Sequence, residues 1–273
     1  MRYFVQTRSD SVSKELTDKF HRLAAERGLQ CDEQTPEIVV SIGGDGTMLH
    51  AFHRYIERLD EIAFVGIHTG HLGFYADWQA TELEDLVDLM SGVKKSDLLS
   101  PRIVKYPLVE LEIHTDSGVR KYLALNEFTV RGIDGTIVAQ IDINDQLFEM
   151  FRGDGICVST PSGSTAYNKS LGGAMLHPAI EALQLAEIAS INNRVYRTLG
   201  SSLILPNHHH CDIYPRNEQR LLLTVDHLSV PLGNLHYVRC SVAKQKVSFA
   251  RYRPYPFWNR VRRAFIGYEN TED

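Results

Sequence analysis

The sequence contains few cysteines and no long apolar run. Only four of its 273 residues are cysteines, and they lie far apart with no Cys-x-x-Cys pair. This usage argues against a disulfide framework or a zinc site and is typical of reduced cytosolic thiols. No stretch of about eighteen apolar residues occurs, and the first dozen residues lack the apolar segment of a signal peptide. We therefore expect a cytoplasmic protein with no membrane-spanning helix.

The sequence also lacks an excess of positive charge. Its 29 Lys and Arg residues are outnumbered by 34 Asp and Glu residues, which gives a formal net charge of -5. Without a general attraction to phosphate backbones or anionic lipid, binding to nucleic acid or to a membrane is not expected. The length and the 43% hydrophobic content instead predict a globular protein, of about two domains at roughly 150 residues each.

The hydrophobic pattern changes near residue 100. Before it, strand-like runs at 3–7, 38–42 and 63–68 alternate with helical patterns at 12–27, 47–58 and 80–90, which is typical of a parallel α/β sheet. After it, a period of two predominates, with one expected strand at 122–130, and a single helical pattern follows at 178–191. We predict an α/β domain at 1–100, a β-rich domain at 101–250, and a tail at 251–273 that returns to the first domain.

The tail mixes arginines with aromatic residues, which is also the composition of a surface that stacks single-stranded nucleic acid. The apolar residues at helical spacing favour a different interpretation. They are Phe257, Val261, Ala264 and Phe265. We expect an amphipathic helix that packs these residues on the core and exposes a basic outer face.

The most informative short segment is the glycine-rich stretch 41–47, which follows an apolar strand and precedes a helix. Its glycines allow a close approach to phosphate, and the helix start offers free N–H groups. It is neither a P-loop nor a dinucleotide fingerprint. Asp45 would repel phosphate unless it has a compensating role. It could accept a proton from an attacking hydroxyl, help to hold Mg²⁺, or simply cap the helix.

Two further segments carry polar side chains suited to a nucleotide. Asn126 and Glu127 combine an amide with a carboxylate, which suits ribose hydroxyls, although a turn or cap role is the commoner use of such a pair. The stretch 159–173 is rich in Ser, Thr and Gly around Tyr167, whose ring could meet a purine, although an ordinary loop has the same composition. The run His208–His210 is interpreted as a solvated loop and not as a metal site.

Taken together, Gly43-Gly44-Asp45-Gly46-Thr47, Asn126-Glu127 and Thr165-Ala166-Tyr167-Asn168 resemble the motifs of the NAD kinase family. The Gly-Gly-Asp-Gly motif alone is shared with diacylglycerol kinases and phosphofructokinases, whereas the set of three is much narrower. The resemblance implies a Rossmann-like parallel α/β domain followed by a β-sandwich-like domain. It also implies transfer of phosphate from ATP, with a divalent cation such as Mg²⁺, to the adenosine ribose 2′-hydroxyl of NAD⁺, and a homotetramer.

The resemblance also implies roles for individual residues. Asp45 would be the general base, Gly44 and Gly46 would face phosphate, and Phe74 would line the pocket. Asn126 and Glu127 would hold ribose hydroxyls. The residues expected at adenine or beside it are Ser162, Thr165, Ala166, Tyr167, Asn168, Lys169 and Ser170. Arg152, Asp154 and Ala189 match further binding positions of a family whose sites are usually completed by a neighbouring subunit.

One segment departs from the family pattern. Many members read Asp-Gly-Gln where this chain has Asp226-His227-Leu228, and His227 could replace a hydrogen-bond donor there. Two other functions are open at this level. A lipid kinase would use the same glycine motif with an apolar or membrane-facing surface, and a sensor would bind a pyridine nucleotide without catalysis.

Overall fold

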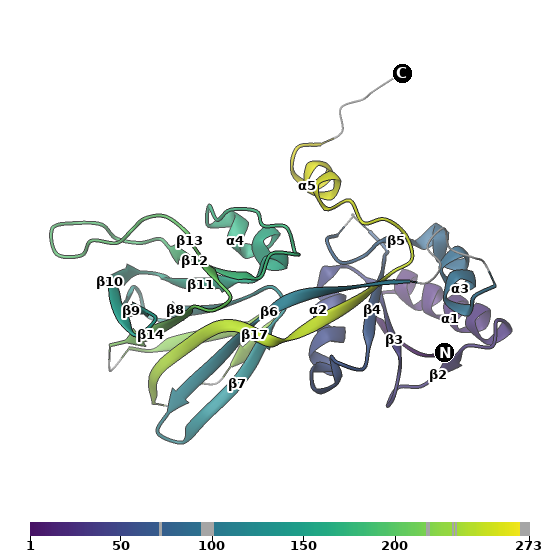
Figure 1. The fold of residues 1–273 in the computed structure, drawn as a ribbon, viewed down its shortest axis with the longest axis horizontal. Helices are drawn as coiled ribbons and strands as arrows, with labels where there is room; N and C mark the ends of the chain where they lie inside the picture. Colours follow the sequence, from purple (N-terminus) through teal and green to yellow (C-terminus); the bar gives the residue numbers. More distant parts are fainter. Residues whose placement is uncertain (71–72, 94–100, 217–218, 231, 233, 268–273) are drawn as a thin grey trace. The chain divides into compact units, whose positions relative to one another are not determined.

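The computed structural model describes residues 1–70, 73–93, 101–216, 219–230, 232 and 234–267. The chain divides into two compact units (Figure 1). The N-terminal unit comprises Met1–Lys105 and Val247–Asp273, and the C-terminal unit comprises Tyr106–Lys246. The boundary expected at residue 100 lies outside the described residues, and the tail belongs to the N-terminal unit.

The N-terminal unit contains a parallel sheet in the order β17–β4–β3–β1–β2. Its elements are β1 (Arg2–Thr7), α1 (Ser11–Glu26), β2 (Gln30–Cys31), β3 (Ile38–Gly43), α2 (Asp45–Arg54), η1 (Ile56–Arg58), β4 (Ala63–His68), β5 (Trp78–Gln79), η2 (Ala80–Glu82), α3 (Leu83–Ser91), the end of β17 (Leu235–Arg251) and α5 (Phe257–Phe265). Strand β3 is buried along its whole length, as expected for an inner strand of a parallel sheet. The α/β prediction for this part is confirmed.

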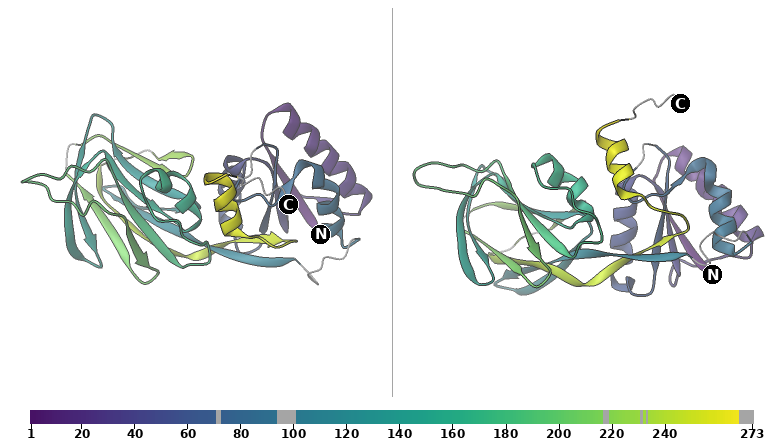
Figure 2. Two further views of the ribbon diagram at one scale, coloured as in Figure 1. Left: turned by 90° about the horizontal axis from the view of Figure 1, so that it is seen from above. Right: turned by 45° about the horizontal axis from the view of Figure 1, so that its top comes forward.

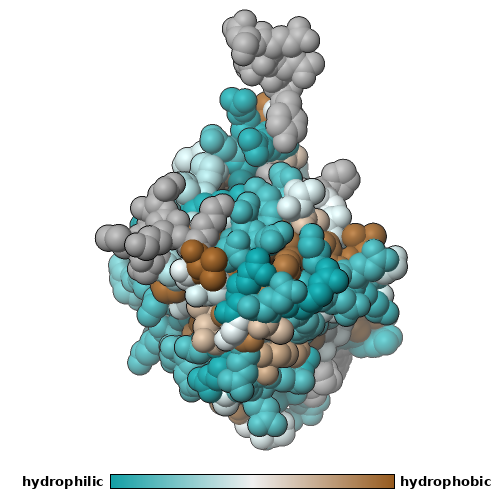
Figure 3. Space-filling model, turned by 90° about the vertical axis from the view of Figure 1, so that its right-hand side faces the viewer, coloured by the Kyte–Doolittle hydropathy of each residue, from teal (hydrophilic) through white to brown (hydrophobic). Residues whose placement is uncertain are grey.

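Local sequence signals explain where the covering helices begin and end. Asp10 caps α1 by accepting a hydrogen bond from the Ser13 N–H at 3.0 Å. Helix α3 ends at Gly92, whose φ of 77° is left-handed. The face of this unit seen in Figure 3 is mostly hydrophilic, with scattered apolar side chains. Among the described residues, no helix is long and apolar enough to cross a membrane.

The C-terminal unit is a β-sandwich. Its elements are β6 (Arg102–Thr115), β7 (Gly118–Ala124), β8 (Glu127–Gly132), β9 (Ile137–Ile143), β10 (Gln146–Gly153), β11 (Gly155–Ser159), η3 (Ser162–Thr165), α4 (Tyr167–Ser170), β12 (Ala182–Ile188), β13 (Leu203–Pro206), β14 (His210–Pro215), β15 (Leu221–Val225), β16 (Leu228–Val230) and the start of β17. One layer follows the order β13–β12–β11–β8–β15–β16, and the other contains β10–β9–β14–β17 with β6 and β7 (Figure 2). Apolar side chains from both layers form one core.

Three expectations for secondary structure need correction. The helix expected at 178–191 is strand β12, which lies between β11 and β13 and is buried on both faces, so its apolar run shows no alternation. The single strand expected at 122–130 is interrupted between β7 and β8, where a side chain replaces the ladder hydrogen bonds of residues 125–127. Of the histidine run, His208 and His209 lie in a turn, but His210 opens β14.

The tail forms the expected helix but turns a different face inward. In α5 the buried residues are Phe257 and Arg260, whereas Ala264 and Phe265 are exposed. Arg260 was expected on the basic outer face. It is buried because a carboxylate and backbone carbonyls of the same unit accept its hydrogen bonds, which offsets the cost of removing a guanidinium from water.

Candidate active site

The glycine-rich segment forms the turn between β3 and α2. Gly43 has φ of 154°, and a Cβ atom there would lie 2.2 Å from the Thr47 Oγ1, so the turn requires glycine. Gly44 and Gly46 are exposed, and a Cβ added at either would meet none of the described residues within 4 Å. The open space and the free N–H groups at the start of α2 make this surface suitable for an anion.

Asp45 does not cap its own helix. Its carboxylate accepts hydrogen bonds from the backbone N–H of Phe74, at 2.9 Å to Oδ2, and of Tyr75, at 3.1 Å to Oδ1. A Cβ at Gly73 would lie 2.3 Å from the Asp45 Oδ1, so the backbone approaches the carboxylate closely. The two segments meet because β3 and β4 are parallel neighbours, which places the residues after both strands at one sheet edge.

Burial raises the pKa of Asp45 above its ordinary value of 3.8. The two backbone hydrogen bonds, and then the charges of Arg260 and His68, oppose this rise. A raised pKa makes the carboxylate a better proton acceptor near neutral pH than an exposed aspartate. The structure therefore gives Asp45 both a fixed orientation and an increased basicity.

The segment that holds Asp45 is itself held by the tail. Arg260 Nη1 donates to the Gly73 carbonyl at 3.0 Å, and its Nη2 donates to Asp77 Oδ1 at 3.0 Å. Arg251 Nη1 lies 2.6 Å from the same carboxylate oxygen of Asp77. The rings of Phe74 and Phe265 stack at a centroid distance of 5.7 Å. The neighbouring residues His71 and Leu72 lie outside the described residues.

In the C-terminal unit, hydrogen bonds to the backbone of Asn126 and Glu127 hold these two residues in place. The Asp226 carboxylate accepts from the N–H of Leu125 at 3.0 Å, of Asn126 at 2.7 Å and of Glu127 at 3.2 Å. On the other side the Thr160 N–H donates to the Asn126 carbonyl at 2.8 Å. These contacts fix the backbone from which the side chains of Asn126 and Glu127 extend.

Burial, and next the charge of Asp226, raise the pKa of Glu127 from 4.5 to about 8, against a backbone hydrogen bond from Tyr167. The raised pKa favours the neutral form of the Glu127 carboxyl. Its Oε2 is buried with no hydrogen-bond partner among the described residues. A buried carboxyl oxygen without a partner is unusual in proteins.

The stretch after β11 surrounds this pair. Ser162 Oγ donates to the Leu125 carbonyl at 3.1 Å, and Thr165 Oγ1 donates to the Ser162 carbonyl at 3.2 Å, so both hydroxyls serve the local fold. Asn168 is fully buried, and a Cβ at Gly173 would lie 2.3 Å from its amide nitrogen. Ala166, Tyr167, Lys169 and Ser170 keep part of their surface accessible.

The remaining candidates separate into two groups along β11. His227, exposed in the turn between β15 and β16, belongs with Glu127, because Val225 pairs with Phe128. Arg152, Asp154 and Ala189 lie at the other end of β11, where Gly155 pairs with Ile188. Glu127 pairs with Ser159, four residues further along β11, so the two groups are about 13 Å apart at 3.3 Å per residue.

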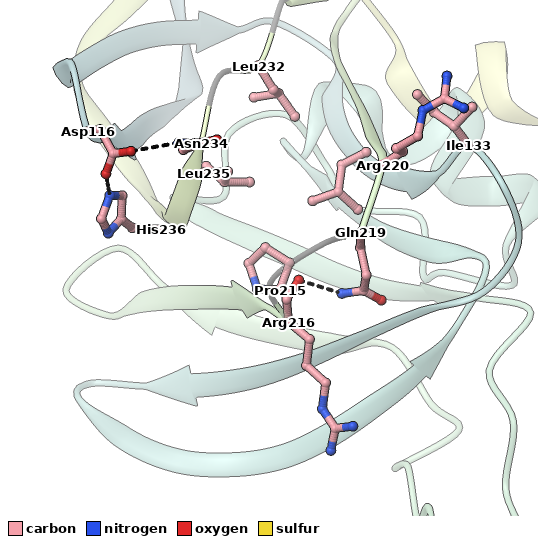
Figure 4. Close-up of a pocket in the computed structure, with 11 residues that line it drawn as sticks. Asp116, Ile133, Pro215, Arg216, Gln219, Arg220, Leu232, Asn234, Leu235 and His236 are labelled. Carbon is pink, nitrogen blue, oxygen red and sulfur yellow. Dashed lines mark hydrogen bonds and ion pairs between the residues drawn. The ribbon is translucent and has the colours of Figure 1, made fainter.

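Two other features of the C-terminal unit contain none of the predicted site residues. A cavity of about 770 Å³ is lined by polar residues that include Asp116, Arg216, Arg220 and His236 (Figure 4). Among the described residues, one group could hold a metal ion by its geometry, Asp145 with His210 and Asp212. Arg239 already donates to Asp212 at 2.7 Å and to Asp145 at 2.8 Å, which opposes a cation there.

Comparison with known proteins agrees with the motifs. The model of the ATP-NAD kinase N-terminal domain matches residues 4–92, and that of the ATP-NAD kinase C-terminal domain matches residues 125–252. NAD kinase 1 of Bacillus subtilis (strain 168) is 54% identical over 98% of this chain and 99% of its own length. The chain belongs to the NAD kinase family. NAD kinase of Lysinibacillus sphaericus (strain C3-41) is likewise 54% identical, over 98% of this chain and 100% of its own.

Solved structures of NAD kinases share the fold. Yeast NADH kinase complexed with NADH superposes with a TM-score of 0.79 at 16% identity, covering 99% of this chain and 89% of the other. An NAD kinase from Archaeoglobus fulgidus in complex with ATP gives a TM-score of 0.72 at 20% identity, covering 98% of both chains. The predictions of the NAD kinase family, of an enzyme of this type and of the fold class are confirmed.

Sequence reasoning missed the residues that position the candidate site. Asp226 was noted only as part of a departure from the family pattern, yet it holds three consecutive N–H groups. An Asp at a tight turn between two short strands was the available signal. Arg260 and Asp77 gave no signal, because nothing in a helical pattern distinguishes an inward arginine from a solvated one.

Proposed function

We propose that this protein transfers the γ-phosphoryl group of ATP to the 2′-hydroxyl of the adenosine ribose of NAD⁺, with Asp45 as the general base. The observation that carries the proposal is the Asp45 carboxylate. It lies between two exposed glycines at the start of α2, is oriented by two backbone N–H groups, and has a raised pKa. Such a group is placed to accept a proton beside a surface suited to phosphate.

In the proposed step the 2′-oxygen forms a bond to the γ-phosphorus while the bond from that phosphorus to the bridging oxygen of ADP breaks. The hydroxyl proton passes to the Asp45 carboxylate, and ADP leaves. Phosphoryl transfer gains more from alignment and electrostatics than from proton removal. The fixed orientation of Asp45 therefore contributes as much as its basicity.

The C-terminal unit supplies groups for the dinucleotide. We propose that Asn126 and Glu127 hold ribose hydroxyls, with the unpartnered Oε2 of Glu127 gaining a hydrogen bond from the sugar. Ala166, Tyr167 and Ser170 would contact adenine, for which the accessible surface of each gives room. Lys169 and His227 would offer donors at the edge of the same pocket.

A divalent cation enters this proposal with ATP. Among the described residues, no group of three His, Cys, Asp or Glu side chains that could hold a metal includes Asp45. Mg²⁺ ordinarily keeps several waters and binds through substrate phosphates with one or two carboxylates. We propose that the triphosphate provides most of the ligands and that the cation neutralises its charge.

We further propose a cytoplasmic homotetramer. The four cysteines are free, and three of them are buried, which suits a reducing compartment. The separation of Arg152, Asp154 and Ala189 from Glu127 supports an arrangement in which this second group contacts the dinucleotide bound to a neighbouring subunit.

The test is a coupled assay. Purified protein is incubated with ATP, Mg²⁺ and NAD⁺, and a dehydrogenase that accepts only NADP⁺ reports the product. We expect Asp45→Asn to bind NAD⁺ as the wild type does but to lose about 10²- to 10⁴-fold in turnover, the usual contribution of a general base. Asp60→Asn makes the same chemical change at an exposed aspartate of this unit and should keep full turnover. Wild-type turnover in Asp45→Asn would refute the base role.

A further inference from the structure

We propose that Arg260 of α5 is a positioning residue for phosphoryl transfer, acting through the segment Gly73–Asp77 on the carboxylate of Asp45. The inference rests on the proposed function of Asp45. It gives the C-terminal helix a role in the reaction, although Arg260 itself touches neither substrate in the proposed step.

The orientation of Asp45 depends on a short piece of backbone. Its carboxylate is bound by the N–H groups of Phe74 and Tyr75, at 2.9 and 3.1 Å. Gly73 approaches so closely that a Cβ there would lie 2.3 Å from the carboxylate oxygen. A small movement of this backbone would therefore rotate or displace the carboxylate, and displacements of about 1 Å can cost about 10²-fold in rate.

Arg260 holds that backbone on both sides of the two N–H groups. Its Nη1 donates to the carbonyl of Gly73 at 3.0 Å and also to the carbonyl of Ala76, while its Nη2 donates to Asp77 Oδ1 at 3.0 Å. The planar guanidinium presents donors in a fixed arrangement, so one side chain can set the spacing of several acceptors. Arg260 is only 8% exposed, so water competes little for these bonds.

The buried charges around Asp77 also connect Arg260 with Asp45. Asp77 is buried and already has an arginine partner, because Arg251 Nη1 lies 2.6 Å from its carboxylate. Arg260 therefore adds a second buried cation for one carboxylate, which is costly unless another anion balances it. The carboxylate form of Asp45 supplies such a charge. Among the described residues, the charged or titratable groups that act on it are Arg260 from α5 and His68 from β4, and both lower its pKa against the effect of burial.

The test compares three variants of the full-length protein by the kcat and KM for NAD⁺, across a pH series, with the melting temperature recorded for each. We expect Arg260→Ala to lose at least tenfold in kcat with the KM for NAD⁺ within threefold of wild type. In the plot of kcat against pH, the rise on the acid side (the acid limb) should move to higher pH, because Asp45 ionises less readily without the guanidinium of Arg260. Arg262→Ala removes one exposed cation from the same helix and should match the wild type.

Arg260→Lys separates charge from geometry. It should keep the acid limb near its wild-type position, because the charge stays, but recover only part of the lost kcat, because an ammonium lacks the arginine's planar arrangement of donors. If Arg260→Ala does not fold, as judged by circular dichroism, this variant decides. A several-fold lower kcat with an unmoved limb then supports the proposal, and a wild-type kcat overturns it.

Two results for a folded Arg260→Ala would also overturn the proposal. One is a wild-type kcat and acid limb. The other is a kcat lowered equally at every pH together with a lower melting temperature, which is what a purely structural role would produce. Failure of the wild-type protein to form NADP⁺ from NAD⁺ would instead refute the proposed function, and it is measured first.

Discussion

Asp45 and Glu127 are carboxyl groups whose pKa values are raised by burial, but their surroundings differ. Asp45 accepts two backbone hydrogen bonds and is influenced by Arg260 and His68, all of which favour its ionised form. Glu127 faces the negative charge of Asp226, and one of its oxygens is buried with no partner in the described part of the chain. The surroundings of Asp45 suit an ionised proton acceptor, and those of Glu127 suit a neutral carboxyl group that hydrogen-bonds to ribose.

The pKa of Glu127 makes the stability of the protein depend on pH. Its folded value is about 8 and its ordinary value is 4.5. Between these values the unfolded chain has released the proton that the folded chain still binds, so stability falls as pH rises through this window and is level above it. We expect Glu127→Gln to lack this fall. Relative to wild type it should gain about 1 kcal/mol or more in unfolding free energy between pH 5 and pH 8.

Denaturant unfolding at a series of pH values measures this directly. Glu57→Gln makes the same substitution at an exposed position in η1 and should unfold in parallel with the wild type at every pH. Parallel curves for Glu127→Gln as well would contradict a neutral Glu127.

At the scale of elements, the candidate site is built where regular structure is interrupted. Strands β7 and β8 would run on through Leu125 and Asn126 if the Asp226 carboxylate did not take the N–H groups there. Asp226 lies in the turn between β15 and β16 with φ of 50°, a left-handed conformation that Asp and Asn tolerate. One turn residue therefore both joins two strands and presents the Asn126–Glu127 pair.

Asp226→Asn tests this arrangement without changing the backbone preference. An amide offers one carbonyl oxygen in place of two carboxylate oxygens, so at least one of the N–H groups of 125–127 loses its acceptor, at a cost of about 1–3 kcal/mol. We expect a lower melting temperature and a KM for NAD⁺ raised by tenfold or more. Loss of the charge should also lower the pKa of Glu127. The pH range over which the free energy of unfolding falls should therefore end at a lower pH than in the wild type. An unchanged KM would argue against this role of Asp226.

The sequence pattern predicted helix α1, which has one buried face, and also the short buried runs of β3 and β4. The longer apolar stretch that contains β12 was mistaken for a helix, because a strand buried on both faces shows no alternation and periodicity alone does not distinguish it from a buried helix. The motif residues Asp45, Asn126 and Glu127 were found because their types suit the chemistry. Arg260 was not, because its burial depends on Asp77 and on carbonyl groups more than 180 residues away along the chain.

At the scale of the whole molecule, each chain carries two groups of candidate binding residues that its own fold keeps apart. Glu127 lies at the Ser159 end of β11, while Asp154 and Ala189 lie at the Gly155 end. Ala189 has φ of 47°, an unusual value for a residue other than glycine, directly after β12. A backbone fixed in this way at a distance from the chain's own Glu127 is consistent with a role toward a second chain.

Mixed oligomers can test whether a site is shared between subunits. Asp45→Asn removes the proposed base, and Asp154→Ala removes a group proposed to act on the neighbour, so each variant alone should have little turnover. When the two are co-expressed in equal amounts, a site is complete if an intact Asp45 meets a neighbour with an intact Asp154. Random assembly with one neighbour per site gives about a quarter of the sites of the wild-type oligomer. Light scattering after gel filtration measures whether the two variants and the mixture have the same oligomeric state. Turnover equal to the mean of the two parent variants would show that every site is complete within one chain, because a base and its dinucleotide contact in the same subunit gain nothing from mixing.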